Sequence, residues 1–164
     1  MSDDGVPADG TEPADERKSH DERKSHDERA AGDERESAYD LFQRGQALLD
    51  GRHFAQAAIV LERANRVEPG KGSILEALGR AYFNSGQHRR SRETFEHLLD
   101  LDPSSHYAHF ALGQSLRHLG RRTEARTHLR LAVALSPGST MYARALARLG
   151  AGRVAPPADG PPDR

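Results

Sequence analysis

The chain has 164 residues, of which 35% are hydrophobic and 30% are charged, and its formal net charge is −1. It contains no cysteine, which excludes disulfides and thiolate metal sites. No stretch of the sequence is long and apolar enough to span a bilayer, and the first residues lack the basic start and apolar run of a secretory signal, so we expect a cytoplasmic protein with no membrane association.

The composition divides the chain into three parts. Residues 1–37 carry 13 acidic and six basic side chains and no aromatic residue, and residues 151–164 are mainly proline, alanine, glycine and charged residues. Neither end can bury enough apolar surface to offset the entropy lost on ordering. We therefore predict a disordered acidic low-complexity tail at 1–37 and a disordered proline-rich tail at 151–164. All nine aromatic residues lie in residues 38–150, which we expect to fold.

Seven helices are predicted in the folding part, and the first six form pairs. Ser37 is a suitable N-cap for the first helix. Glycines at 51, 86 and 120 follow the first helix of each pair, where a left-handed residue ends a helix. The predicted pairs are 38–50 with 54–67, 72–85 with 89–101, and 106–119 with 123–135, and the last helix is 140–149.

Each second helix ends at a proline, and the three prolines are spaced by 34 residues: Pro69, Pro103 and Pro137. A fixed period of this length indicates a stacked helical repeat, in which each unit buries its apolar face on the next. Gly79 lies in the middle of a helix, where glycine costs about 1 kcal/mol relative to alanine, so it needs a packing reason. We predict that the second helix of the pair approaches closely there, at Ser91. Gly45 and Gly113, with Ala57 and Ala125, repeat the arrangement one period away on either side.

The repeating residues form a recognisable motif. The middle unit has Leu75-x2-Leu78-Gly79-x2-Tyr82, then Ser91-x3-Phe95, then Pro103. The third has His109-x2-Leu112-Gly113-x2-Leu116, then Ala125-x3-Leu129, then Pro137, and the first has Leu41-x2-Arg44-Gly45-x2-Leu48, then Ala57-x3-Leu61, then Pro69. Over about residues 38–149 the sequence resembles the tetratricopeptide repeat family. The resemblance implies an all-α fold, a right-handed superhelical array of three helix-turn-helix repeats at 38–71, 72–105 and 106–139 with a C-terminal capping helix at 140–150.

In this family the first helices of the pairs line a concave groove. The resemblance therefore implies a non-catalytic protein-interaction module, or scaffold, that binds a peptide or helix of a partner in that groove. Aromatic side chains beside Gln, Asn and Arg are suited to anchoring such a segment, although neighbouring helices could instead bury Phe83 and Phe110. The ten candidate groove residues are Tyr39, Phe42, Gln46, Arg80, Phe83, Asn84, Tyr107, Phe110, Gln114 and Arg117.

Some members of the family bind the acidic C-termini of heat-shock chaperones through a clamp of Lys and Asn. The matching positions in the first unit of this chain are Phe42 and Gln46. The clamp is missing, so we do not expect that class of partner.

No catalytic constellation is present in the sequence, and we predict no enzyme activity, no cofactor and no metal. His106 and His109 are three residues apart on one helix and could share a metal, but no third ligand is evident nearby, and we favour a core position for His109.

The alternative function is binding of nucleic acid or an acidic partner through the basic third repeat. Residues 106–150 contain seven arginines against Glu124 alone, and three of these arginines recur at every fourth residue on the second helix. A solvated face explains this stripe of Arg122, Arg126 and Arg130 better. We expect a protein partner, rank nucleic acid behind it, and expect a monomer or weak self-association.

Overall fold

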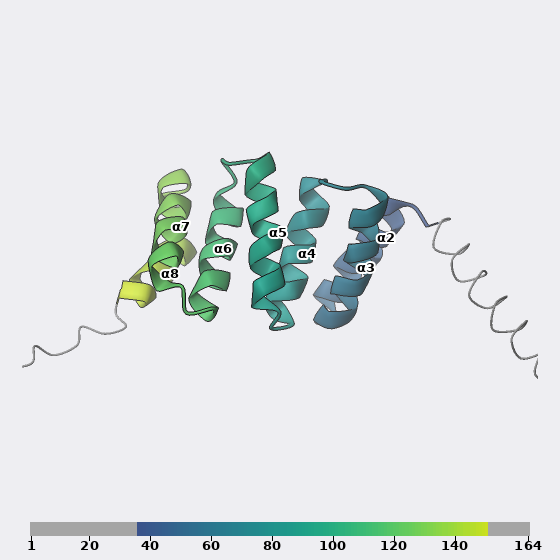
Figure 1. The fold of residues 1–164 in the computed structure, drawn as a ribbon, viewed down its shortest axis with the longest axis horizontal. Coiled ribbons are helices and arrows are strands. Elements are labelled where there is room, and N and C mark those ends of the chain that lie inside the picture. The colour runs from purple at the N-terminus through teal and green to yellow at the C-terminus, as the bar shows by residue number, and fades with distance from the viewer. Residues whose placement is uncertain (1–35, 151–164) are drawn as a thin grey trace, which may run out of the picture. The chain divides into compact units, whose positions relative to one another are not determined.

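The computed structural model describes residues 36–150, and all regular secondary structure in this range is helical (Figure 1). Every helix begins and ends within one residue of its predicted bounds. The prediction of an all-α fold of paired helices is confirmed. The predicted disordered tails lie outside the described residues, except for Glu36 and Ser37. The helices are α2 (Ala38–Asp50), α3 (Phe54–Val67), α4 (Gly72–Asn84), α5 (His88–Leu101), α6 (His106–His118), α7 (Arg122–Leu135) and α8 (Thr140–Gly150).

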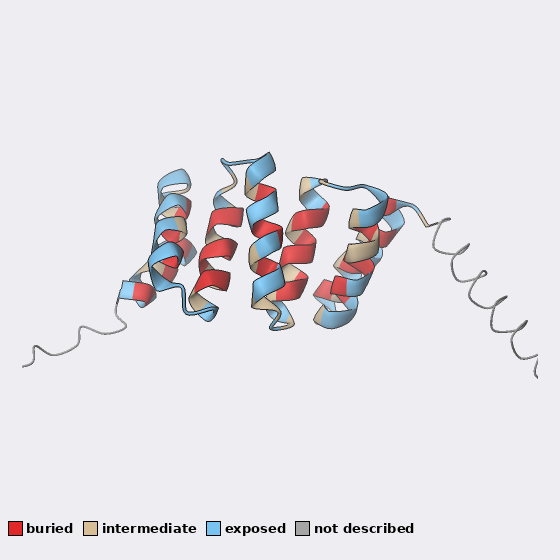
Figure 2. Ribbon diagram, viewed as in Figure 1, coloured by how far each residue is buried: buried red, intermediate tan, exposed pale blue. Residues whose placement is uncertain are grey.

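The helices form two layers. In the inner layer α2 contacts α4, α4 contacts α6 and α6 contacts α8, whereas within residues 36–150 the Cα atoms of α3, α5 and α7 do not approach one another within 8 Å. The helix pairs therefore touch through their first helices and are further apart at their second helices. This arrangement makes the row of pairs concave on the side of the first helices. The first helices are also covered more completely: seven residues are buried in α4 and seven in α6, against four in α5 and three in α7 (Figure 2).

Glycine permits the close approach within each pair. A Cβ added to Gly79 would lie 2.6 Å from the ring Cζ of Phe95, too close for any side chain. The same added atom would lie 2.5 Å from Leu61 at Gly45 and 2.8 Å from Leu129 at Gly113. The small residues opposite, Ala57, Ser91 and Ala125, are fully buried, so the predicted packing is confirmed.

The turns within the three pairs share one geometry, and one predicted detail of them is wrong. Gly86 and Gly120 adopt left-handed backbone angles with φ of 80° and 78°, but in the first turn the left-handed residue is Arg52 (φ 61°), not Gly51. Arg52 stands 34 residues before Gly86, so the repeat period places the turn even where the sequence supplies no glycine. In each turn a backbone N–H reaches back five residues to a carbonyl, as in a Schellman cap: His53 to Leu48, Gln87 to Tyr82 and Arg121 to Leu116, at 2.8, 2.8 and 2.9 Å.

Helix α8 covers the end of the array, as predicted for a capping helix. Ala145 and Leu149 are buried in the same core cluster as Leu112 of α6 and Leu129 of α7. The Arg122 guanidinium donates a 2.8 Å hydrogen bond to the Leu149 carbonyl, which supplies a partner to the C-terminal turn of the cap. No helix within residues 36–150 is long and apolar enough to cross a membrane.

Candidate functional site

A cleft opens on the inner layer between α4 and α6. Its volume is about 180 Å³. We call it the aromatic cleft. Six of the ten candidate groove residues line it, so the structure brings together side chains that lie up to 34 residues apart in the sequence. The lining residues are Arg80, Phe83, Asn84, Phe95, Tyr107, Phe110, Ala111 and Gln114.

The aromatic side chains of the cleft are held by rings around them. Phe110 stacks on Tyr142 of α8, with ring centroids 4.8 Å apart and planes 27° from parallel. The ring centroid of Tyr107 is 6.2 Å from that of Phe95 and 6.2 Å from that of Phe110. Tyr107 and Phe110 are half-buried rather than fully exposed, so each offers one side to the cleft while the other is packed.

Polar groups on the rim of the cleft include one unsatisfied acceptor. Gln114 Oε1 is buried and has no hydrogen-bond partner in the described part of the chain, while Asn84 donates to the carbonyl of Arg80 at 3.0 Å. Burial raises the pKa of the Tyr107 phenol, and the positive charge of Arg80 partly opposes this shift. The phenol is therefore neutral at physiological pH, and the cleft combines apolar walls with a cation and an amide.

The other four candidate residues are distributed along the inner layer. Tyr39 and Phe42 line a second pocket of about 240 Å³ between α2 and α4, with Lys71 and Ile74 among its other residues. Gln46 lines neither pocket. Arg117 also lies outside both; its Nη2 is 3.3 Å from His118 Nε2, and His118 stacks on His88 at 4.2 Å. The structure thus divides the predicted groove into two pockets.

The histidine pair considered for a metal forms two separate contacts. His106 Nδ1 lies 2.9 Å from the Tyr142 hydroxyl, whereas His109 contacts His128 of α7 and the carbonyl of Pro103. Among residues 36–150 no group of three or more potential metal ligands gathers.

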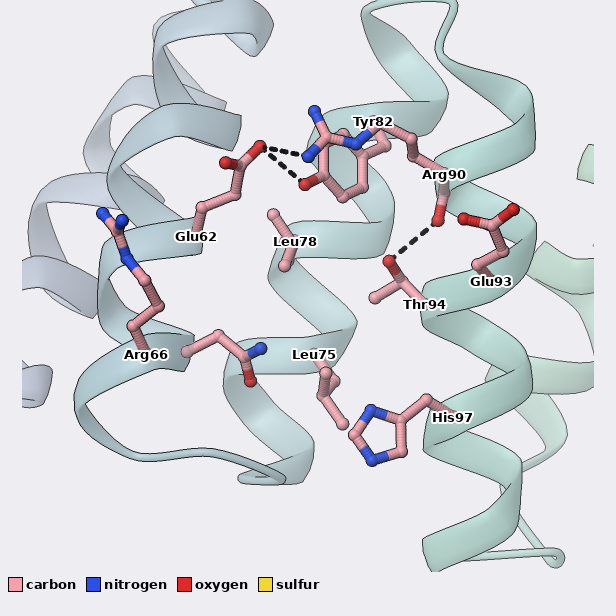
Figure 3. A pocket seen from close by; sticks show the side chains of 10 residues that line it. Glu62, Arg66, Leu75, Leu78, Tyr82, Arg90, Glu93, Thr94 and His97 are labelled. Carbon is pink, nitrogen blue, oxygen red and sulfur yellow. Dashed lines mark hydrogen bonds and ion pairs between the residues drawn. The ribbon is translucent and has the colours of Figure 1, made fainter.

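A third cavity lies on the opposite side of the repeats, and sequence reasoning missed it. It has a volume of about 400 Å³, with α3 and α5 as walls and α4 as floor (Figure 3). We call it the outer groove. Its lining residues are Glu62, Asn65, Arg66, Leu75, Leu78, Tyr82, Arg90, Glu93, Thr94 and His97.

A network across the upper part of the outer groove joins the first two repeats. The Tyr82 hydroxyl donates to Glu62 Oε1 at 2.6 Å, and Arg90 Nη2 lies 3.0 Å from the same oxygen (Figure 3). The Arg90 guanidinium also stands 4.5 Å from the centroid of the Tyr82 ring, a cation–π contact. Burial, together with the hydrogen bond to Glu62, raises the pKa of Tyr82.

A comparison at 34-residue spacing could have revealed this network. Glu62, Tyr82 and Arg90 correspond to Glu96, Leu116 and Glu124 in the next unit, so the set of acid, phenol and guanidinium occurs at one junction and is absent one period later.

The family model described as tetratricopeptide repeat matches residues 42–88 and 76–140. The comparison with curated proteins found no match.

Solved structures share the fold at low sequence identity. The first TPR of Spaghetti (RPAP3), bound to the HSP90 peptide SRMEEVD, is 16% identical with a TM-score of 0.66, covering 70% of this chain and 90% of that chain. The Sgt2 TPR domain from Aspergillus fumigatus is 21% identical with a TM-score of 0.67, covering 77% and 89%. MamA from Desulfovibrio magneticus is 19% identical with a TM-score of 0.69, covering 71% and 66%.

Proposed function

The chain belongs to the tetratricopeptide repeat family, and we propose that it is a non-catalytic interaction module that binds a peptide or helix of a partner protein along its inner layer. The aromatic cleft is the centre of this proposed site. Phe83, Tyr107 and Phe110 would anchor an apolar side chain of the partner, and Arg80 and Gln114 would pair with its polar groups.

One observation carries the proposal. Gln114 Oε1 is a buried acceptor without a partner, at the wall of a cleft whose other walls are aromatic rings. Leaving a buried acceptor unsatisfied costs about 1–3 kcal/mol, so a donor supplied by a partner would recover free energy at the place where apolar burial also occurs.

The partner should differ from the acidic chaperone tail held by one of the structural neighbours. That neighbour is bound to an HSP90 peptide. This chain has Phe42 and Gln46 at the positions of the Lys and Asn clamp, and Phe42 lines an apolar pocket rather than presenting a charge. We expect apolar side chains of the partner to provide more of the binding free energy than its carboxylates.

Selection from a displayed random-peptide library tests the proposal. Peptides selected against the full chain should lose at least about tenfold in affinity with Phe110→Ala and with Phe83→Ala, as anchor residues at an interface do. Phe54→Ala removes a half-buried phenylalanine from α3, outside the aromatic cleft, and serves as the matched control. Peptides that bind all three variants equally would exclude the aromatic cleft as the site.

A second function has one observation in its favour. Arg126 and Arg130 are exposed on α7, and no ion pair with either is present within residues 36–150. Together with the other arginines of the third repeat they could attract an acidic partner or a phosphate backbone. Binding of a 20-nucleotide single strand should then weaken steeply with salt and be lost in Arg126→Glu/Arg130→Glu, whereas peptide binding in the aromatic cleft should change little with salt.

A further inference from the structure

The outer groove has a counterpart one repeat later, and the two are filled differently. Leu75 and Thr94 of the outer groove correspond to His109 and His128, 34 residues further on. There the two imidazoles occupy the space between α6 and α7. Their Nδ1 atoms are 3.1 Å apart, and His109 Nε2 is 3.1 Å from the carbonyl oxygen of Pro103.

The hydrogen bonds fix the protons on this imidazole pair. A carbonyl oxygen only accepts, so His109 Nε2 carries a proton and, in the neutral ring, His109 Nδ1 is an acceptor. His128 must then donate its Nδ1–H to His109 Nδ1. The ring centroids are 5.3 Å apart with planes 25° from parallel, a stacked arrangement. An imidazole therefore fits this position of the repeat when the surroundings offer it an acceptor.

The outer groove offers such an acceptor, but it has Leu75 and Thr94 where the third repeat has the two imidazoles, and the histidine in its lining is His97 of α5. The cavity that Leu75 and Thr94 help to line has a volume of about 400 Å³. Asn65 Oδ1, on the α3 wall, is buried and has no hydrogen-bond partner within residues 36–150. The residue at this position in the next repeat is Leu99, which needs no partner. The amide acceptor of Asn65 is thus present beside the outer groove and is absent at the equivalent position of the next repeat.

The charges around the outer groove favour a neutral ligand. The lining has two acidic residues, Glu62 and Glu93, and two basic residues, Arg66 and Arg90. Glu62 and Arg90 already form an ion pair with each other. An anion or cation would meet both signs at once. A ring with an apolar body and one N–H suits a floor of Leu75 and Leu78 beside an amide oxygen.

We propose that the outer groove binds a histidine side chain presented by a segment of a partner protein. The neutral imidazole lies over Leu75 and Leu78 and donates its ring N–H to Asn65 Oδ1. This site is on the opposite side of α4 from the aromatic cleft, so it is separate from the proposed peptide site, and both can be occupied at once.

The probe for this site is Nα-acetyl-histidine methylamide, titrated into the isotope-labelled full chain at pH 8, where its imidazole is neutral. We expect saturable shifts of the Asn65 side-chain amide, the Thr94 amide and the Leu78 methyl groups. Asn65→Leu introduces the residue of the next repeat and should weaken binding about tenfold, the effect of losing one well-made hydrogen bond. Asn84→Leu makes the same chemical change at the aromatic cleft and should leave binding of the probe unchanged.

A second variant fills the site from within. Leu75→His/Thr94→His rebuilds the imidazole pair of the third repeat at the outer groove and should abolish the shifts. If circular dichroism shows that this double variant does not fold, the comparison of Asn65→Leu with Asn84→Leu decides the question. The proposal is overturned by the absence of saturable shifts, by equal affinity in Asn65→Leu and the wild type, or by equally tight binding of Nα-acetyl-phenylalanine methylamide.

Discussion

The Ser91 hydroxyl of α5 donates a 3.0 Å hydrogen bond to the backbone carbonyl of Gly79 in α4. This bond exists because Gly79 has no side chain, which lets the two helices approach until a hydroxyl reaches the neighbouring backbone. The same hydroxyl is 2.9 Å from the hydroxyl of Ser115, which lies 2.9 Å from the carbonyl of Ala111 in its own helix. Each hydroxyl has one proton, so the pair makes two of these three hydrogen bonds at a time. Two buried hydroxyls thus connect α4, α5 and α6 where they pack.

Gly79→Ala should destabilise the fold although alanine favours helix. The new methyl group would lie 2.6 Å from the Phe95 ring, and overpacking of this kind costs about 1–3 kcal/mol, more than the roughly 1 kcal/mol gained in helix propensity. Urea unfolding followed by circular dichroism measures the loss. In a Phe95→Ala background the ring is absent, so the same change should become neutral or stabilising. A loss of equal size in both backgrounds would show that the ring is not the cause.

Arg52→Gly and Gly86→Ala should have opposite effects, because both positions adopt the left-handed backbone conformation. Glycine at 52 relieves a conformation that costs an L-residue roughly 1 kcal/mol or more, so we expect a gain of about 1 kcal/mol. Alanine at 86 introduces that cost, and no atom lies within 4 Å of its Cβ, so the loss reports the backbone alone. Thermal unfolding of the two variants checks the prediction, and shifts of the same sign would contradict it.

Tyr82→Phe should cost about 1–2 kcal/mol in stability, the range for a hydrogen bond to a charged group that is partly exposed. The phenylalanine ring keeps the contact with Arg90, so only the bond to Glu62 is lost. The free energy of unfolding in urea measures this, and Glu62→Gln in each background gives the coupling between the two side chains. A coupling near zero would mean that the 2.6 Å contact contributes nothing.

Stability should fall as the pH drops below the ordinary histidine pKa of about 6.5. Burial lowers the pKa of His128, and His109 adds to this, while Glu124 partly opposes it. Just below pH 6.5 the unfolded chain therefore binds protons that the folded state does not. The free energy of unfolding rises with pH through this range, and the stabilising contribution of neutral His128 is complete above it. Burial lowers the pKa of His118 as well, with the same sign.

Unfolding in urea at pH 7.5 and pH 5.5 tests the role of His128. His128→Gln keeps a donor for His109 but does not titrate, so its loss of stability between the two pH values should be smaller than that of the wild type. His97→Gln, on an exposed histidine, is the matched control. A variant with the same or a larger loss than the wild type would rule out His128 as a source of the pH dependence.

A chain that ends at Pro137 should aggregate or lose its cooperative transition. Without α8 the apolar partners of Ala145 and Leu149 in the third repeat meet water, and Phe110 loses the ring of Tyr142. Light scattering and thermal unfolding compare this chain with one that ends at Gly150, which should stay soluble. Cooperative melting of the shorter chain at the same temperature would contradict the capping role of α8.

The helices could be predicted from sequence because their signals are local. Proline positions, the spacing of apolar residues and the mid-helix glycines set bounds that the structure matches within one residue. Residue type alone predicts Gly51 as the left-handed residue of the first turn, whereas the repeat period places it at Arg52, where the structure has it.

The candidate site was accessible to sequence reasoning only in part. The residues of the aromatic cleft share helix faces that the motif defines. The outer groove depends instead on side chains that meet across helices, such as Tyr82 with Glu62, 20 residues apart, and on an amide oxygen left without a donor. No local pattern encodes which long side chains reach one another, so this cavity required the structure.

The imidazole pair also bears on how the chain finds its correct order. Repeats of similar sequence can pair incorrectly during folding, so that a helix packs against the equivalent helix of the wrong repeat. If α7 packed on α4 in place of α6, His128 would face Leu75 and would lose its hydrogen bond with His109 Nδ1. An incorrectly paired array is therefore less stable at this contact. The chemical difference between the second and third repeats thus favours the correct pairing.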